Sequence, residues 1–171
     1  MNKTRIIGTL AATALITLPI ASFAAEGPKG KNEIMGSASY TDIEDTTLTN
    51  IDLAYGRYLT DVHEVGLRVG YLDMEFDGVG GDGTTLGGFY HLNLPVDGMV
   101  RPYVGVTAAA IGGDLGDAYD FSYGAEAGVK LYAFENAGVN FGVAYQRFEG
   151  AEKWIDDADG VSVKVGLLMR F

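Results

Sequence analysis

The chain contains no cysteine and only 4 prolines among its 171 residues. The lack of cysteine excludes disulfides, and with them a small disulfide-stabilised secreted scaffold. Beyond the amino-terminal segment the chain also lacks any apolar run that approaches the roughly 20 residues of a membrane-spanning helix. If the chain is exported, it is therefore either soluble or a closed β-barrel, the other structure that satisfies every backbone group in lipid.

The amino-terminal segment has the order of a secretory signal peptide. Two basic residues precede an apolar stretch over residues 6–20, and a run of small residues follows. We expect cleavage after Ala24, with cleavage after Ala25 as the alternative. An uncleaved transmembrane helix is disfavoured because the apolar stretch is short. The sequence thus predicts a signal peptide over 1–24 and one barrel domain over 25–171.

Basic residues are scarce in the remainder of the chain. Because Lys3 and Arg5 belong to the predicted signal, 10 basic residues face 23 acidic ones, a formal net charge of −13. Phosphate binding needs a basic surface, so we expect no nucleic-acid partner. Cations or a basic protein suit this charge better.

Apolar and polar residues alternate with a period of two over eight segments, the pattern of strands with two different faces. These segments are 32–41, 48–59, 65–71, 84–94, 100–111, 121–132, 138–146 and 161–171. Eight strands form a barrel whose interior is filled by side chains. The sequence predicts an all-β fold, an eight-stranded antiparallel up-and-down transmembrane β-barrel.

A charge argument selects the strand face that meets lipid. A Lys or Arg facing lipid costs roughly 2 to 4 kcal/mol at the bilayer midplane. The phase rich in Val, Leu and Tyr must point outward, since the opposite phase would expose Arg68, Lys130 and Lys164 together.

The connections alternate between short turns and longer loops, the asymmetry of outer-membrane barrels. With both termini in the periplasm, the predicted inner turns are 60–64, 95–99 and 133–136. The predicted outer loops, which hold most of the acidic residues, are 42–47, 77–83, 112–120 and 149–160.

The inward phase carries the candidate site, a polar network inside the barrel. Its predicted members are Arg68, Glu126, Lys130, Asn140, Gln146 and Lys164. Buried charges need partners, so we expect ion pairs that hold the barrel closed. The alternative is a narrow ion path gated by a Glu126 salt bridge, although a side-chain-filled interior counts against it.

Two outer loops form an acidic crown, whose predicted members are Asp114, Asp117, Asp120, Glu149, Glu152, Asp156, Asp157 and Asp159. Oxygen-rich clusters can hold Ca²⁺ or Mg²⁺, but no EF-hand spacing is present. We expect solvated, self-repelling loops, with divalent bridging to lipopolysaccharide phosphates as the functional alternative. Trp154 lies among these acids and either anchors a partner or packs over the barrel mouth.

Catalytic constellations are missing from the sequence. The two histidines, His63 and His91, have no serine two residues later, and no triad or metal-ligand spacing is present. We therefore expect two structural histidines, no enzyme activity, no catalytic residues and no cofactor or metal.

Several strand segments resemble the small outer-membrane β-barrel superfamily of Gram-negative bacteria, the eight-stranded opacity-like and OmpX-like proteins. The resemblance rests on residues 101–106, 124–129 and 142–148 and on the terminal Phe171, and it covers nearly all of residues 30–171. It implies an outer-membrane location and a Phe171 that the barrel-assembly machinery reads as an insertion signal. The short outer loops depart from the family pattern.

The expected function is a structural or surface-interaction role, adhesin-like or in envelope integrity, through the acidic outer loops. The expected partners are outer-membrane lipid, lipopolysaccharide, divalent cations or a basic protein, and the protein is expected to be a monomer. One alternative is a small low-conductance pore. Another is a soluble periplasmic lipocalin-like binder, which would be polar outside and apolar inside.

Overall fold

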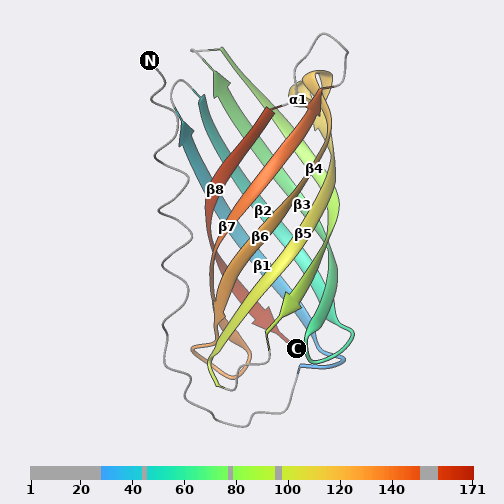
Figure 1. Cartoon of the computed structure of the whole chain (residues 1–171), viewed down its shortest axis with the longest axis vertical. Helices are drawn as coiled ribbons and strands as arrows, with labels where there is room; N and C mark the ends of the chain where they lie inside the picture. The colour runs from blue at the N-terminus through green and yellow to red at the C-terminus, as the bar shows by residue number, and fades with distance from the viewer. Residues whose placement is uncertain (1–27, 44–45, 77–78, 95–97, 151–157) are drawn as a thin grey trace, which may run out of the picture.

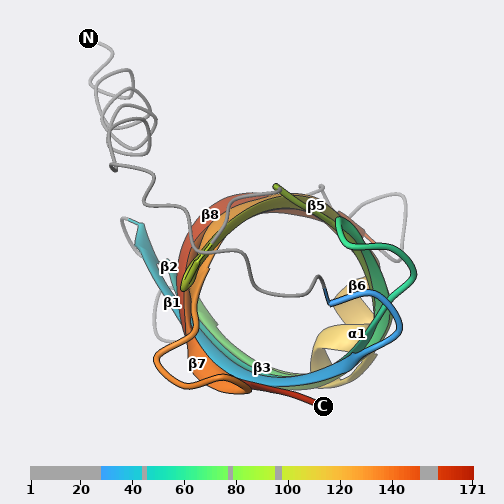
Figure 2. The same cartoon turned by 90° about the horizontal axis from the view of Figure 1, so that it is seen from below.

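The computed structural model describes residues 28–43, 46–76, 79–94, 98–150 and 158–171, which form a closed antiparallel barrel of eight strands with one short helix. Each strand pairs with the next along the chain, and β1 also pairs with β8, which closes the ring seen in Figure 2. The predicted eight-stranded up-and-down architecture is confirmed. The elements are β1 (Asn32–Ile43), β2 (Thr46–Tyr58), β3 (His63–Phe76), β4 (Val79–Asn93), β5 (Val100–Gly113), α1 (Asp114–Ala118), β6 (Tyr119–Leu131), β7 (Ala137–Gly150) and β8 (Ala158–Arg170).

The two ends of the barrel differ in their connections (Figure 1). We call one the helix end, because α1 lies there in the β5–β6 connection together with the β1–β2, β3–β4 and β7–β8 connections. We call the other the turn end; it holds the β2–β3, β4–β5 and β6–β7 connections, the start of β1 and Phe171. At the turn end, the backbone amides of Asn32 and Phe171 each donate to the carbonyl of the other residue, at 2.7 and 2.9 Å.

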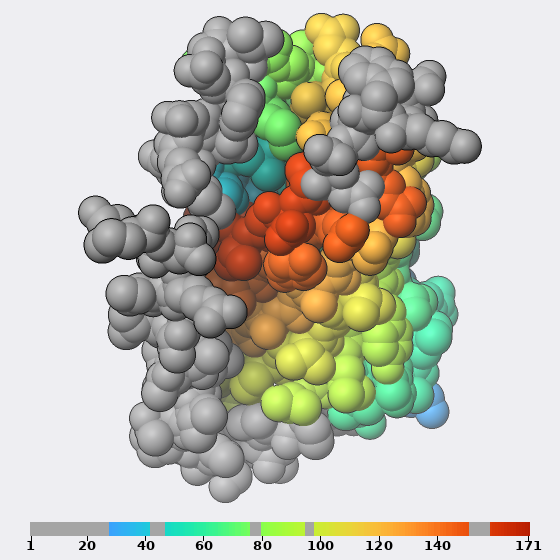
Figure 3. Space-filling model, turned by 45° about the horizontal axis from the view of Figure 1, so that its top comes forward, coloured from blue at the N-terminus to red at the C-terminus, as the bar shows by residue number. Residues whose placement is uncertain are grey.

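The alternation of side chains along each strand places apolar residues outward and polar residues in the lumen. On β8, Val163 and Leu167 are 67 and 70% exposed, whereas Lys164 between them is 4% exposed. Strands β5 to β8 lie side by side on the outer surface drawn from yellow to red in Figure 3. The predicted phase is therefore confirmed, and the apolar interior expected of a lipocalin-like binder is not what the described strands contain.

The strands extend further toward the helix end than the sequence predicts. Residues 42–47 and 77–83 were predicted as loops, yet Ile43 pairs with Thr46 and Phe76 pairs with Val79 in hairpin registers. The predicted loop 112–120 contains α1, which starts after Gly113. Gly113 has a φ of 84°, in the left-handed region that glycine adopts without strain. The helix is only five residues long, and no helix in the described residues is long and apolar enough to cross a membrane.

Candidate functional site

A cluster around Lys130 fills the lumen at the turn end. The Lys130 ammonium donates to Glu33 Oε1 at 2.5 Å, to Glu64 Oε2 at 2.7 Å and to the Tyr58 hydroxyl at 3.2 Å. The Tyr132 hydroxyl also donates to Glu33, and the Asn93 amide donates to Glu64 at 3.1 Å. Lys130 is completely buried, so its charge depends on these two carboxylates rather than on water.

A second cluster gathers around Glu126, midway along the lumen. Arg68 Nη2 donates to Glu126 Oε1 at 2.9 Å, and Lys164 Nζ donates to Glu126 Oε2 at 2.7 Å. The three side chains come from β3, β6 and β8, so the carboxylate ties together strands that are not neighbours in the sheet. All three are buried, which makes each charge depend on the others.

His91 joins the two clusters. Its Nε2 forms a short hydrogen bond with Glu126 Oε1, and its Nδ1 lies 3.4 Å from Glu64 Oε2. The imidazole ring packs between the rings of Phe89 and Tyr103, with both centroid distances at 4.5 Å. The His91 ring therefore lies between the two clusters, hydrogen-bonded to Glu126 and close to Glu64.

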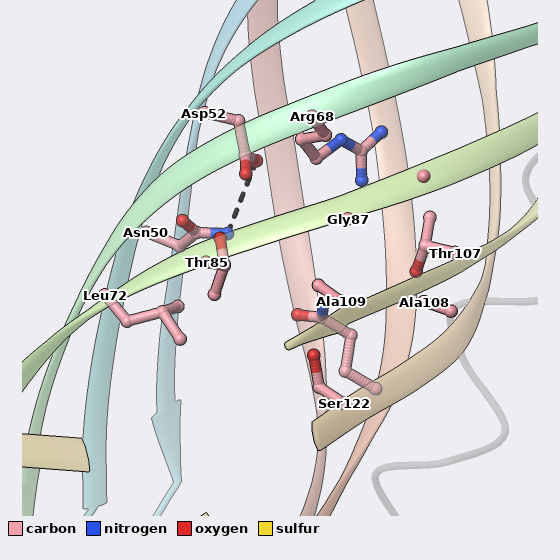
Figure 4. A pocket seen from close by; sticks show the side chains of 12 residues that line it. Asn50, Asp52, Arg68, Leu72, Thr85, Gly87, Thr107, Ala108, Ala109 and Ser122 are labelled. Atoms are coloured by element: carbon pink, nitrogen blue, oxygen red, sulfur yellow. Dashed lines mark hydrogen bonds between the residues drawn. The ribbon is translucent and has the colours of Figure 1, made fainter. Parts of the chain in front are cut away.

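A small cavity of about 20 Å³ lies between the Glu126 cluster and the helix end (Figure 4). Its walls include Asp52, Arg68 and Gln146, together with the smaller side chains of Thr85 and Ser122. Asp52 accepts hydrogen bonds from Asn50 Nδ2 at 3.3 Å and from the Ser37 hydroxyl at 3.5 Å. Lys164 Nζ lies 4.0 Å from Asp52 Oδ2.

An apolar cluster closes the lumen at the helix end. Leu115 of α1 packs against Leu72 and Phe148, and Met74 and Ile111 lie around them. The described lumen thus contains two ion-pair clusters, a small polar cavity, this apolar plug and a second apolar cluster. The second apolar cluster is formed by Met35, Ala54, Phe89, Tyr132 and Leu168. Such an interior is filled by side chains, as expected for eight strands.

The structure places the sequence-predicted interior residues in four different settings. It joins Arg68, Glu126 and Lys164 directly and sets Lys130 in the neighbouring cluster. Asn140 donates to the Tyr103 hydroxyl at 3.3 Å, whereas Gln146 lines the cavity rather than the ion pairs.

Sequence reasoning missed more than half of the network, including three carboxylates and a histidine. The missed members are Glu33, Asp52, Glu64, His91, Tyr58, Tyr103, Tyr132 and Asn93. Glu64 was assigned to a turn, but β3 begins at His63 and brings Glu64 into the lumen. Glu33 and Asp52 occupy inward positions of strands that were predicted correctly. Their period-two phase was the signal that could have found them.

The acidic crown is only partly described. Asp114, Asp117, Asp120, Glu149 and Asp159 are all exposed at the helix end. Glu152, Asp156, Asp157 and Trp154 lie outside the described residues. Across the residues that are described, no group of three or more His, Cys, Asp or Glu side chains is arranged to hold a metal ion.

Comparison with solved structures finds proteins of similar fold. No protein-family model matches the chain, and no curated protein matches its sequence. The N-terminal β-barrel domain of Pseudomonas aeruginosa OprF matches with a TM-score of 0.52 and 22% identity, over 84% of this chain and 98% of that one.

Two further solved structures match at 13% identity and a TM-score of 0.54. They are Neisserial surface protein A, over 82% of this chain and 93% of that one, and the Yersinia pestis outer membrane protein Ail, over 84% and 100%. The shared feature at these identities is the arrangement of strands. The chain therefore has the fold of the small eight-stranded outer-membrane β-barrels.

Proposed function

We propose that the protein is a non-enzymatic outer-membrane β-barrel with a structural or surface-interaction role. In this proposal the helix end faces the cell exterior and the turn end faces the periplasm. The observation that carries the proposal is a band of exposed apolar side chains around a lumen filled with buried ion pairs.

The outward surface supports insertion in a bilayer. Large exposed apolar residues occur on all eight strands, among them Leu53 at 56%, Leu67 at 66% and Leu86 at 63% exposed. A soluble protein rarely exposes such a continuous apolar surface, whereas lipid would cover it. Closure of the sheet leaves no unpaired strand edge in the apolar band.

The contents of the lumen argue against transport along the barrel axis. Transport along the axis would have to pass the Lys130 cluster, the Glu126 cluster and the plug formed by Leu115. Opening that path would separate buried charges, at a cost of several kcal/mol for each ion. The low-conductance pore is therefore the second choice.

The two rims of the barrel differ in charge, which supports a role at the surface. Exposed acids at the helix end are Asp73, Glu75, Asp82, Asp114, Asp117, Asp120, Glu149 and Asp159. The turn end carries five basic residues, Lys29, Lys31, Arg57, Arg101 and Arg170, and two exposed acids, Asp61 and Glu135. The acidic rim suits divalent cations that bridge to lipopolysaccharide, or a basic protein.

Epitope accessibility tests the location and orientation together. One tag is inserted in the β7–β8 connection and a matched tag in the β2–β3 connection, and intact cells are labelled with antibody. We expect labelling of the β7–β8 tag alone, together with recovery in the outer-membrane fraction and heat-modifiable migration on a gel. Labelling of the β2–β3 tag alone would show the opposite orientation. Recovery of the protein in the soluble fraction would contradict the proposal.

Planar-bilayer recording separates the structural role from the pore. We expect no conductance steps from the refolded protein. Reproducible conductance steps that change with Glu126→Gln would instead favour a pore controlled by the Glu126 cluster.

The acidic rim is tested by thermal unfolding with and without millimolar Ca²⁺. A Ca²⁺-dependent rise in melting temperature that is lost with Asp114→Asn and Asp117→Asn would support the cation role, and an unchanged melting temperature would remove it.

A further inference from the structure

The outward face of the barrel carries different charges at its two ends. Charged residues at outward strand positions of the helix end include Asp73, Glu75, Asp82, Arg147, Glu149 and Asp159. At the turn end, Arg57 is the one Lys, Arg, Asp or Glu at an outward position of the described strands. The outward positions between these two levels hold apolar, aromatic, glycine or threonine residues.

Arg57 lies at the border of the apolar band. On the outward side of β2 it follows Leu53 and Tyr55, which are 56 and 48% exposed, and precedes Leu59. The strand ends one residue after Arg57, where the β2–β3 connection of the turn end begins (Figure 1). An arginine at such a position covers apolar surface with its methylene chain, while its guanidinium reaches the polar headgroups of the bilayer.

The strands next to Arg57 carry side chains that are typical of a membrane interface. Arg57 pairs with Val65 of β3, and Val65 pairs with Tyr90 of β4. The next outward residue of β3 toward the turn end is His63, whose Nδ1 lies 2.6 Å from the Tyr90 hydroxyl oxygen. His63 is therefore a diagonal neighbour of Arg57, a relation that corresponds to about 7 to 8 Å. Aromatic side chains gather at this level in outer-membrane barrels.

The charge around Arg57 is positive. Lys29 and Lys31 lie beside it at the start of β1, where the Tyr58 amide donates to the Lys31 carbonyl at 3.0 Å. The exposed acid Asp61 is also close to this segment, because its Oδ1 accepts a hydrogen bond from the Lys29 backbone amide at 3.1 Å. Arg57 itself forms no ion pair with any residue that the structure describes. Its charge is thus left for a group outside the protein.

A phosphate group suits this position. The planar guanidinium of arginine binds phosphate oxygens through two parallel N–H···O bonds. A zwitterionic headgroup would also bring an ammonium or choline group, for which the described strands offer no outward carboxylate at the turn end. An anionic headgroup brings the negative charge alone, and it therefore matches the turn end better.

We propose that Arg57, with Lys29 and Lys31 beside it, binds the phosphate of an anionic phospholipid in the periplasmic leaflet of the outer membrane. The inference rests on the insertion and orientation given under the proposed function. A basic residue near anionic lipid favours the contact by roughly fivefold. The contact holds the turn end at the level of the headgroups and so fixes the depth of the barrel in the bilayer.

The test measures which lipids the protein retains. The protein is refolded into vesicles made of equal parts phosphatidylglycerol and phosphatidylcholine, extracted in detergent, and its bound lipids are counted by native mass spectrometry. We expect roughly fivefold more phosphatidylglycerol than phosphatidylcholine, and a smaller preference when the vesicles are kept in high salt, which screens exposed charges. Equal retention of both lipids by the inserted protein would overturn the proposal.

Two matched variants assign the preference to Arg57. Arg57→Gln removes the outward charge, and we expect it to lose most of the preference for phosphatidylglycerol. Arg101→Gln is the control, because it removes the same charge from the turn end at an inward position, where Arg101 donates to the Asp61 carbonyl at 3.0 Å. An unchanged preference in Arg57→Gln, or an equal loss in both variants, would refute the assignment.

Inorganic phosphate distinguishes a lipid headgroup from a free anion. Sodium phosphate and sodium chloride are compared at equal ionic strength, and we expect the same amount of retained phosphatidylglycerol in both. Displacement of the lipid by phosphate alone would identify a site for free phosphate and overturn the lipid assignment. Recovery of the protein outside the vesicles would contradict the proposed membrane location and this inference with it, whereas an inserted protein without lipid preference contradicts this inference alone.

Discussion

Replacing Glu126 with glutamine should lower the unfolding free energy of the barrel more than a glutamate-to-glutamine substitution at an exposed position. The Glu126 carboxylate accepts hydrogen bonds from Arg68 and Lys164, and His91 Nε2 lies at hydrogen-bond distance from it. Glutamine has nearly the same shape, so packing is retained. Its amide group, however, places an NH₂ donor next to the donors of Arg68 and Lys164. It also removes the negative charge that these two cations require.

The expected cost follows from the burial of the cluster. Glu126 is 5% exposed, Lys164 4% and Arg68 9%, so water can replace little of what the carboxylate provides. Removing one member of a buried ion pair costs about 3 to 5 kcal/mol, because the remaining charges stay buried and uncompensated. We expect a loss in this range for Glu126→Gln. The double variant Glu126→Gln with Lys164→Met should recover part of it, since one uncompensated charge is then removed.

Equilibrium urea unfolding of the purified protein in detergent or lipid vesicles measures this loss. The control is Glu149→Gln, an exposed carboxylate on β7, which should change the unfolding free energy by less than about 0.5 kcal/mol. If Glu126→Gln unfolds within about 0.5 kcal/mol of the parent protein, the lumen charges are compensated in some other way and the reasoning fails.

Three other substitutions test the packing of the barrel. Gly66→Ala should prevent correct folding, because its methyl group would lie 2.3 Å from the Tyr55 carbonyl oxygen, whereas Gly160→Ala, with no atom within 4 Å, should fold normally in the same refolding gel. Leu115→Ala should lower the unfolding free energy by about 2 to 4 kcal/mol by leaving a cavity in the helix-end plug; an unchanged urea midpoint would show that α1 does not seal the lumen. Val69→Lys, on the outward face, should cost about 2 to 4 kcal/mol in lipid vesicles, and the absence of a cost would contradict a lipid-facing position.

The sequence predicts the strands of the barrel and their outward faces better than the pairing of side chains in the lumen. Alternation alone assigns Val163 and Leu167 outward and Lys164 inward, because a strand has a period of two whatever its partners are. The same rule extends to β6 and β7. It fails at the strand ends near the helix end, where Gly-rich and acidic segments are typical of loops but in fact continue the hairpins of β3 and β4.

The pairing of charges in the lumen depends on information that a single strand does not contain. Lys130 meets Glu33, 97 positions away in the chain, because barrel closure and strand tilt place them at one level of the lumen. Period-two alternation shows that both residues face inward but not at which height. The central position of His91 between Glu64 and Glu126 has the same origin, and for this reason it was predicted only as a structural histidine.

The pairing of β1 with β8 has a consequence for how the protein reaches its folded state. These two strands are the first and the last of the meander, and until they meet, both retain a row of unpaired backbone groups. Hydrophobic hairpins with open edges are prone to associate with other chains. The barrel therefore cannot close before β8 has been synthesised. We expect chaperones to keep the polypeptide unfolded until β1 and β8 pair in a late step of folding.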